Sequence, residues 1–422
     1  MPLESQRHGM HEDEIPVTVL SGSLGAGKTT LLNHLLQNAG RRDLAVLVND
    51  MGSVNVDADL VAEGSDLDAG GVTELSNGCI CCELQDDLET AVVRLARERA
   101  FDHLLVESSG ISEPEPVARL FTTASRVAAS YEIDALVTVL DTRRFLDTFA
   151  GEDVPERRGE TEANETRPLA DLMIEQLEVA NLVLLNKTDL CTETELEEAE
   201  ALVGALQPGA ETIRTAFSAV DPDRILGVDL FDAARMGELA GWQHALAEED
   251  ADDQHRDHDH DDGSDDTHDH DHRHPEERYG VDSVVFRARR PFHPERFAAF
   301  LEALPSSIVR SKGLAWIAGR DGKVDLSQAG PSIRATVRGP WIAALPEIRQ
   351  ELYRSNRPDL EWHDEHGDRQ TELVFIGTGI DDEQLHARLE DSLVTDEEWN
   401  RADTLENPFP TDETDDVVLR EP

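Results

Sequence analysis

The chain has 422 residues, a length that predicts two or three domains able to bury a sizeable core. It carries 89 acidic and 38 basic residues, which gives a formal net charge of −51 at pH 7. This charge repels nucleic acid and anionic lipid, so we expect neither as a partner. No stretch approaches the roughly 20 apolar residues of a membrane span, and residues 1–14 lack the apolar core of a signal peptide. We therefore expect a cytoplasmic protein with reduced thiols and with residues 1–14 as a disordered leader.

The first motif lies at residues 22–29 and fits the phosphate-binding loop pattern G-x-x-x-x-G-K-[ST]. An apolar run over 15–20 predicts a buried strand before it, and 29–37 predicts a helix after it. Main-chain N–H groups of such a loop, at a helix N-terminus, cradle nucleotide phosphates. Lys28 is expected to reach the β/γ oxygens and to take part in catalysis, and the Thr29 hydroxyl is expected to bind Mg²⁺. The nucleotide-binding residues predicted here are Gly22, Ser23, Leu24, Gly25, Ala26, Gly27, Lys28, Thr29 and Thr30.

Glu107 ends an apolar run that begins at His103 and is followed by Ser-Ser-Gly. The run predicts another buried strand, and open α/β sheets bind ligands at the carboxyl ends of their strands. We expect the Glu107 carboxylate to act near the γ-phosphate, either through a water on Mg²⁺ or by orienting the attacking water. The alternative is a strand-end carboxylate that only caps the next turn. No arginine finger is identified from the sequence.

Asn186, Lys187 and Asp189 belong to the motif Asn-Lys-Thr-Asp, which follows an apolar run over 181–185. An aspartate carboxylate can accept hydrogen bonds from N1–H and the 2-amino group of guanine, whereas adenine offers no matching pair. Leaving such an acceptor buried without a partner costs roughly 1–3 kcal/mol. Downstream of a phosphate loop, the motif predicts GTP as the nucleotide. The alternative is an ordinary polar turn after a strand.

Cys79, Cys81 and Cys82 form the motif Cys-Ile-Cys-Cys. Clustered thiols in a reducing compartment suit a soft or borderline ion such as Zn²⁺, Co²⁺, Ni²⁺ or Cu⁺. Three thiolates leave a fourth coordination position open, so the site could pass its metal on. A permanently filled structural zinc site and a redox site are the alternatives, although adjacent cysteines pair poorly with each other. Cys191 is expected to be a small buried residue.

Strands that alternate with helices indicate a mainly parallel sheet covered on both faces. Residues 15–235 are therefore predicted to form a P-loop NTPase domain of the α/β class. Residues 58–78 are expected to be a loop, and 151–167 a charged surface insertion. The other predicted strands are 43–49, 133–141, 181–185 and 211–215, and the other predicted helices are 84–100 and 193–206.

The composition changes at residues 236–278, which are predicted to be a flexible acidic linker. Seven histidines lie between residues 248 and 274. They either collect transition metal loosely, because imidazoles at x-His-x-His spacing are good ligands, or are incidental in a solvated linker.

Residues 279–395 are predicted to form a smaller α+β domain, and 396–422 an acidic, mostly extended tail. The predicted strands of that domain are 281–288, 308–310, 314–318, 332–338 and 372–376, and its predicted helices are 294–304 and 381–393.

This chain resembles the CobW-type metallochaperone GTPases, because the phosphate loop, residues 49–52, the cysteine motif, the Glu107 segment and Asn-Lys-Thr-Asp occur in that family's order. Residues 281–393 resemble the family's C-terminal domain, and residues 396–410 resemble the tail of its zinc-responsive branch. The resemblance implies slow GTP hydrolysis with Mg²⁺. It also implies a metal ion held at the cysteine motif until hydrolysis releases it to a client protein. This chain departs from the family at Ser53, where the family usually has a glutamate.

The favoured interpretation is a GTP-dependent metal chaperone for zinc, with cobalt next, that serves an unidentified metal-requiring client protein. The γ-phosphate and Mg²⁺ would order the loops at 50–57 and 79–82 and thereby complete the thiolate site. One alternative is a metal store or buffer that binds through the histidine tract. Another is a GTPase for maturation of a cobalt or nickel enzyme. The sequence is compatible with a homo-oligomer.

Four of the 38 basic residues are lysines, and a dense carboxylate surface with few lysines fits solubility in concentrated salt. We predict a halophilic protein whose thermal unfolding midpoint rises from low salt to molar KCl, because salt screens the repulsion between carboxylates. Calorimetry over a KCl series measures this midpoint. A midpoint that falls as KCl is added would contradict the halophilic interpretation.

Overall fold

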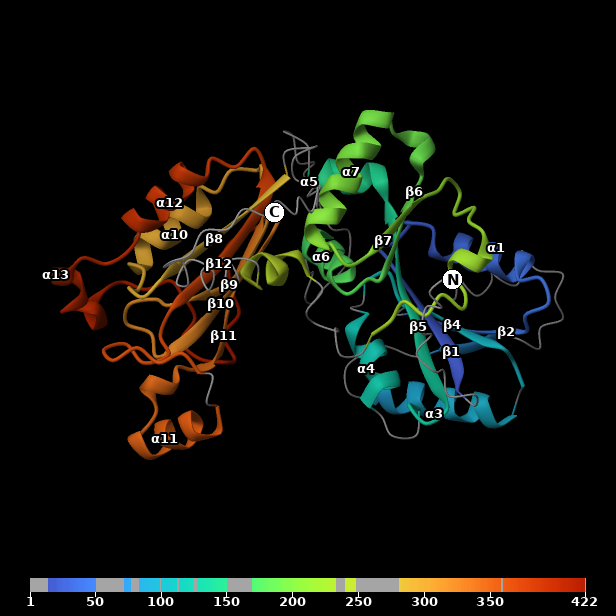
Figure 1. The fold of residues 1–422 in the computed structure, drawn as a ribbon, viewed down its shortest axis with the longest axis horizontal. Helices are drawn as coiled ribbons and strands as arrows, with labels where there is room; N and C mark the ends of the chain where they lie inside the picture. The colour runs from blue at the N-terminus through green and yellow to red at the C-terminus, as the bar shows by residue number, and fades with distance from the viewer. Residues whose placement is uncertain are drawn as a thin grey trace, which may run out of the picture. The chain divides into compact units, whose positions relative to one another are not determined.

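The computed structural model describes ten stretches of the chain, which form two compact units with a β-sheet each (Figure 1). The first unit comprises residues 1–144, 175–196 and 209–237, and the second comprises 145–174, 197–208 and 238–422. The expected leader up to residue 13, the cysteine motif, the 151–167 insertion, the histidine tract and Ser53 lie outside the described residues. The described stretches are 14–50, 72–76, 83–98, 100–111, 114–123, 127–149, 169–232, 240–247, 281–357 and 360–421.

The sheet of the first unit has seven strands in the order β3-β2-β4-β1-β5-β6-β7, and every neighbouring pair is parallel. This confirms the predicted P-loop NTPase fold of the α/β class. Parallel pairing brings the carboxyl ends of β1, β4, β5 and β6 to one edge of the sheet. The predicted phosphate loop follows β1, Glu107 ends β4 and Asn186 ends β6. The strands are β1 Ile15–Ser21, β2 Leu44–Asp50, β3 Val72–Ser76, β4 His103–Glu107, β5 Tyr131–Asp141, β6 Leu182–Asn186 and β7 Glu211–Arg214.

Helices pack on both faces of this sheet because the strands are apolar on both sides (Figure 1). Val46 and Val48 of β2 face the cluster that contains α1, whereas Ala45 and Leu47 face the cluster that contains α3 and α4. No helix within the described stretches is long and apolar enough to cross a membrane. The helices that contribute to these clusters are α1 Lys28–Asn38, α3 Glu83–Glu98 and α4 Glu115–Thr123. Three more helices, α5 Thr142–Phe149, α6 Leu169–Glu178 and α7 Glu193–Leu206, each have residues in both units, and short 3-10 helices lie at Thr188–Leu190 and Pro222–Arg224.

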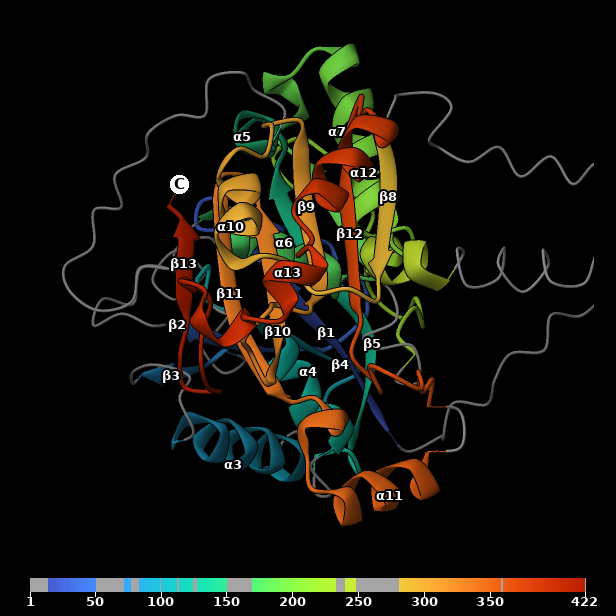
Figure 2. The same ribbon diagram turned by 90° about the vertical axis from the view of Figure 1, so that its left-hand side faces the viewer.

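The second unit is built on an antiparallel six-stranded sheet in the order β13-β11-β10-β9-β12-β8, which appears from left to right in Figure 2. Helices α10 and α12 lie across the face turned to the viewer in that figure. Its strands are β8 Val281–Ala288, β9 Ile308–Ala315, β10 Gly322–Ala329, β11 Ser332–Pro340, β12 Thr371–Thr378 and β13 Val417–Arg420. Its helices are α10 Pro294–Glu302, α11 Glu347–Asn356, α12 Asp382–Asp391 and α13 Asp396–Trp399, with 3-10 helices at Ile342–Ala344 and Ala402–Thr404.

The tail beyond residue 395 is part of this packed unit, although the sequence analysis expected an acidic, mostly extended segment. Phe409 is 2% exposed, and its ring centroid lies 5.6 Å from that of Phe297 in α10. Arg320 donates hydrogen bonds to the carbonyl oxygens of Asn407, Phe409 and Pro410. The last strand, β13, then pairs with β11. One buried aromatic residue therefore anchors a segment whose composition is otherwise typical of a solvated tail.

Three other differences concern strands. The predicted strands 308–310 and 314–318 are joined in β9, which passes through Gly313, where a Cβ would lie 2.1 Å from the carbonyl oxygen of Glu372. Strand β10 was missed because its sequence is mostly polar. Strand β3 lies inside the stretch expected to be a loop.

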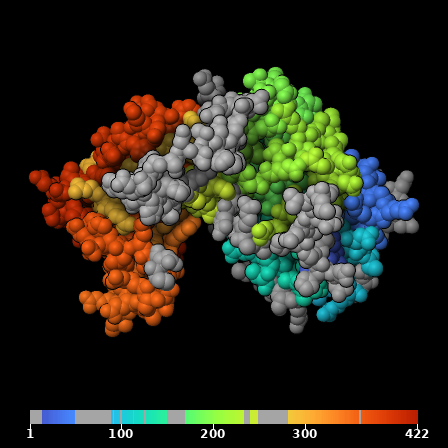
Figure 3. Space-filling model, viewed as in Figure 1, coloured from blue at the N-terminus to red at the C-terminus, as the bar shows by residue number. Residues whose placement is uncertain are grey.

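Helix α11 was also missed, and it forms the orange protrusion at the bottom of the second unit in Figure 3. None of its residues is buried, and Ile348 is 83% exposed. Because burial gives the main signal for a helix in a sequence, an exposed helix leaves little trace in the apolar pattern.

A buried polar cluster lies near the amino ends of the central strands of the first unit. Thr18 Oγ1 lies 2.8 Å from Nε2 of His103 and 3.3 Å from Oδ2 of Asp134. Asp134 also accepts hydrogen bonds from the backbone N–H groups of Gly227 and Asp229. Burial lowers the pKa of His103 to about 4, although the nearby Asp134 carboxylate opposes this shift. The imidazole is therefore neutral in the folded protein at neutral pH.

We predict that His103 makes the folded protein less stable as the pH falls from 6.5 toward 4. An unfolded histidine takes up a proton near pH 6.5, whereas the folded one does so near pH 4, so the unfolded state binds more protons in this window. Between pH 6.5 and pH 4, the free energy of unfolding of His103→Gln should fall by less than that of the parent, with a difference of at most about 3 kcal/mol. Urea unfolding at a series of pH values measures this. Parallel curves for variant and parent would contradict the prediction.

Candidate functional site

The predicted phosphate loop connects β1 to α1, and two of its glycines are required by close contacts. Gly22 has φ 136°, and a Cβ there would lie 2.2 Å from the carbonyl oxygen of Val139. Gly27 has φ 114°, and a Cβ there would lie 2.4 Å from Nδ2 of Asn186. Glycine alone lets the backbone turn in this way without collision. The loop therefore presents main-chain groups at the N-terminus of α1, which is the geometry of an anion site.

Lys28 and Thr29 begin α1 directly beneath this loop. The Lys28 ammonium donates to the carbonyl oxygen of Gly22 at 2.7 Å, and the residue is 6% exposed. Thr29 Oγ1 donates to Oε1 of Glu107 at 3.1 Å. The fold thus brings the Thr29 hydroxyl of α1 next to the Glu107 carboxylate of β4, although the two residues lie far apart in the chain. Oxygen donors of this kind suit Mg²⁺, so the residues present fit the predicted ion.

The segment after β4 lies against the phosphate loop. Ser108 donates a side-chain hydrogen bond to the carbonyl oxygen of Leu20 at the end of β1. At Gly110, a Cβ would lie 2.8 Å from the backbone nitrogen of Leu24 and 3.2 Å from Nζ of Lys28. The absence of a side chain at Gly110 therefore keeps open the space next to the Lys28 ammonium, where a terminal phosphate would bind.

Asn186, at the end of β6, ties the phosphate loop to a second loop that sequence analysis missed. Its Nδ2 donates to the carbonyl oxygen of Ala26 at 2.8 Å and to Oγ of Ser218 at 3.0 Å. Its Oδ1 accepts from the backbone N–H of Ser218 at 2.9 Å. Ser218 Oγ then donates to the carbonyl oxygen of Gly27. The motif asparagine thus has a buried structural role in addition to its predicted role at the base.

The missed loop follows β7 and contains Phe217 and Ser218, which have φ of 54° and 55°. Left-handed backbone is uncommon for such residues and is maintained here by the bonds to Asn186. Phe217 is 74% exposed, so its ring is available to a ligand. Glycine or asparagine at these positions would have indicated the turn, and their absence explains why the pattern gave no signal.

Lys187 and Asp189 lie at the open side of the same region. The Lys187 ammonium forms an ion pair with Oδ2 of Asp141 at 2.7 Å. Asp189 lies in the 3-10 helix Thr188–Leu190 and is exposed. Thr188 hydrogen-bonds the carbonyl oxygen of Thr215, which joins this turn to the missed loop. An exposed carboxylate can accept hydrogen bonds from the edge of a base. That Asp189 binds guanine stays a prediction.

The predicted metal ligands Cys79, Cys81 and Cys82 fall outside the described residues. Within the stretches that the structure describes, no group of three or more histidine, cysteine or acidic side chains could hold a metal ion. Cys191 was expected to be buried and is instead half-buried.

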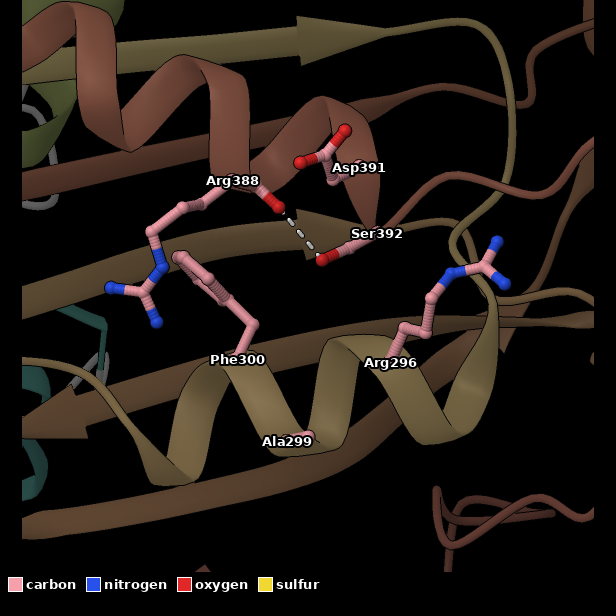
Figure 4. A pocket seen from close by; sticks show the side chains of 6 residues that line it. All are labelled: Arg296, Ala299, Phe300, Arg388, Asp391 and Ser392. Carbon is pink, nitrogen blue, oxygen red and sulfur yellow. Dashed lines mark hydrogen bonds between the residues drawn. The ribbon is translucent and has the colours of Figure 1, made fainter.

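A shallow hollow of about 340 Å³ lies in the second unit between α10 and α12 (Figure 4). The Arg388 guanidinium stacks over the Phe300 ring at its edge. Arg296 donates to both carboxylate oxygens of Glu398, and this hydrogen bonding holds the pKa of Glu398 well below its usual range. The lining also includes the carboxylate of Asp391, so the hollow is not a concentrated cationic site, and it contains none of the predicted site residues.

We predict that Asn186→Ala and Asp189→Ala have different effects on the apo protein. Asn186→Ala leaves the Ala26 carbonyl and the Ser218 N–H without their partner and should cost about 1–3 kcal/mol of stability. Asp189→Ala removes an exposed side chain and should change stability by less than about 0.5 kcal/mol. Denaturant unfolding without nucleotide measures both. Equal stability of the two variants would contradict the structural role of Asn186.

Two family models match this chain in order along the sequence. A family model described as "CobW/HypB/UreG, nucleotide-binding domain" matches residues 16–214. A second, "Cobalamin synthesis protein cobW C-terminal domain", matches residues 281–393. Zinc-regulated GTPase metalloprotein activator 1 of Dictyostelium discoideum is 35% identical over 409 residues, which cover 92% of this chain and 81% of that protein.

Another relative matches less of its own length. The zinc chaperone CobW of Pseudomonas aeruginosa is 36% identical over 210 residues, which cover 47% of this chain and 56% of that protein. The solved structure of Zn(II)-bound YjiA GTPase from Escherichia coli is 18% identical, with a TM-score of 0.35, and the match covers 90% of this chain and 99% of that one. The long match to the Dictyostelium protein, with both family models in order along the sequence, shows that this chain belongs to the CobW family.

Proposed function

We propose that the protein is a GTP-hydrolysing metallochaperone that delivers zinc to a metal-requiring client protein. The observation that carries the proposal is the convergence of the phosphate loop, the Thr29–Glu107 pair and Asn186 at one sheet edge, in a chain that also has the cysteine motif. Zinc is favoured over cobalt because relatives across the family are named as zinc chaperones or zinc-regulated activators.

The first step is binding of GTP. Main-chain N–H groups of residues 22–29 would hold the phosphates, and the Lys28 ammonium would exchange its bond with the Gly22 carbonyl for phosphate oxygens. Asp189 would accept hydrogen bonds from guanine. Thr29 and Glu107 would hold Mg²⁺, which when bound draws negative charge from the phosphate oxygens.

The second step is hydrolysis, in which the protein mainly positions groups and stabilises charge. The Glu107 carboxylate is 2% exposed and touches the Thr29 hydroxyl, so it is fixed where it can orient the attacking water or a metal-bound water. Gly110 keeps the backbone of its segment close to Lys28. Slow turnover is expected from the resemblance to the CobW-type GTPases.

The cysteine motif lies between two elements that the structure describes. It follows β3, which ends at Ser76, and precedes α3, which begins at Glu83. Strand β3 is three strands away from β1, a separation of about 14 Å at the usual strand spacing. Residues 77–82 join these two elements, and six residues span at most about 20 Å when fully extended.

We propose that the γ-phosphate orders residues 50–57 and 79–82 and so completes a thiolate site for zinc. Hydrolysis would remove the γ-phosphate contacts and loosen the site, which releases zinc to the client. Loading should weaken as the pH falls, because a thiolate binds metal only when deprotonated. The cytoplasm, where thiols stay reduced, is the expected compartment.

We predict that Cys81→Ser and Cys82→Ser each abolish tight GTP-dependent zinc binding and leave GTP affinity within about twofold. Competition with a chromophoric zinc chelator, with and without a non-hydrolysable GTP analogue, measures zinc affinity. Cys191→Ser is the matched control, because Cys191 lies outside the motif. Equal zinc affinity of the unmodified protein with and without the analogue would refute the switch.

Deletion of residues 250–275 distinguishes a chaperone from a metal buffer. A chaperone keeps its one tight zinc site after the deletion, because the thiolates hold it. A buffer loses most of its bound metal, because the histidines hold it. Equilibrium dialysis followed by metal analysis counts the bound ions. The same assay with cobalt and nickel tests the alternative of a GTPase for cobalt or nickel enzymes.

A further inference from the structure

Arg144 contacts the phosphate loop from outside the known motifs. It lies in the first turn of α5, directly after β5, and its Nη1 donates to the carbonyl oxygen of Leu24 at 2.9 Å. Its backbone N–H donates to Oδ1 of Asp141 at 3.1 Å, which fixes the start of the helix. The backbone of Arg144 is thus fixed at the start of α5, and its guanidinium reaches from there to the middle of the phosphate loop.

The Leu24 carbonyl determines the direction of the next N–H group. In a planar trans peptide, the C=O and the following N–H point in opposite directions. With its C=O turned to the Arg144 guanidinium, the Leu24–Gly25 peptide must turn the Gly25 N–H away from Arg144. A phosphate loop binds its ligand through N–H groups that point inward. The bond from Arg144 therefore favours the orientation that a phosphate needs.

A turn hydrogen bond from the Ala26 N–H to the Ser23 carbonyl at 3.1 Å spans this peptide, but it involves neither the Leu24 carbonyl nor the Gly25 N–H. Gly25 has φ 77° and carries no side chain that would restrict rotation of this peptide, and a Cβ built there would meet no atom within 4 Å. The Leu24 side chain is 69% exposed and gives no packing restraint. On the other side, the close approach of Gly110 fixes the Leu24 nitrogen and Cα but does not hold the carbonyl. Arg144 supplies the missing restraint.

Asp141 connects this restraint to the loop predicted to bind the base. One of its carboxylate oxygens accepts from the Arg144 backbone N–H, and the other pairs with the Lys187 ammonium at 2.7 Å. The neighbouring Arg143 has a different partner, because its Nη1 donates to Glu195 at 2.6 Å. Arg143 thus pairs with a residue of α7 outside the site, whereas Arg144 contacts the phosphate loop.

We propose that Arg144 is a positioning residue for GTP hydrolysis, which locks the Leu24–Gly25 peptide with its N–H directed at the phosphates. The inference rests on the proposed function, since it assigns a role in that same hydrolysis. It differs from an arginine finger because the guanidinium acts through the Leu24 carbonyl. Hydrolysis depends on N–H donors that are preoriented toward developing charge, so a donor that rotates freely lowers the rate more than the affinity.

The test compares Arg144→Met, Arg144→Lys and Arg143→Met in the full-length protein. Arg144→Met removes the donors and keeps an unbranched side chain, whereas Arg144→Lys keeps one cationic donor for the Leu24 carbonyl. For Arg144→Met we expect single-turnover GTP hydrolysis to slow about tenfold, with the Kd for GTP changed by less than about threefold. Arg144→Lys should recover at least half of the lost rate, and Arg143→Met should react at the parent rate.

A second readout does not depend on turnover. The phosphorus NMR resonance of the β-phosphate of bound GDP reports the N–H groups around it, and it should shift in Arg144→Met and stay in place in Arg143→Met. A parent-like rate in Arg144→Met, an equal loss in Arg144→Lys, or an equal loss in Arg143→Met would overturn the inference. A parent protein without GTPase activity would overturn the proposed function instead, and an unshifted resonance in Arg144→Met would then overturn the inference independently.

Discussion

The site depends on one buried amide at a point where three loops meet. Asn186 is 2% exposed, and its three hydrogen bonds join the end of β6 to the phosphate loop and to the loop that contains Ser218. Loss of a buried partner costs about 1–3 kcal/mol for each group left unsatisfied, so these loops cannot separate cheaply. The same amide explains Gly27, because any side chain there would collide with Asn186 Nδ2. Hydrogen bonds therefore join the phosphate loop to the loops that follow β6 and β7 without a bound nucleotide.

Sequence reasoning found the parts of this site that follow buried strands directly. The phosphate loop, Glu107 and Asn186 were identified because an apolar run and a motif lie side by side in the chain, and the parallel α/β fold was confirmed. The Ser218 loop was not identified, because its left-handed residues are imposed by tertiary hydrogen bonds and not by residue type. Likewise, the burial of Phe409 could not be predicted, because the segment around it is acidic and acidic segments are usually exposed to solvent.

A net charge of −51 means that this chain must bind an anionic nucleotide against its own long-range field. In the proposed site the attraction would therefore be local, from the N-terminus of α1, the main-chain N–H groups of the loop and the nearly buried Lys28 ammonium. Lys187 contributes little net charge, because Asp141 neutralises it. In molar salt the Debye length shrinks to about 3 Å, which removes the repulsion and leaves these short contacts intact. The acidic surface and the nucleotide site are thus compatible in the saline environment that the composition predicts.

The proposed switch can use only the part of the site that distinguishes GTP from GDP. Guanine, ribose and the first two phosphates are common to both, so Asn186, Lys187 and Asp141 experience the same ligand before and after hydrolysis. In the proposed site, the γ-phosphate would lie near Lys28, Glu107 and Gly110, on the side of β4 and β2. Strands β2 and β3 are paired up to their last residues, Asp50 and Ser76, so the segments that follow them leave the sheet as neighbours. In the proposed switch, a signal from the γ-phosphate would therefore pass along the ends of β2 and β3 and not through the base.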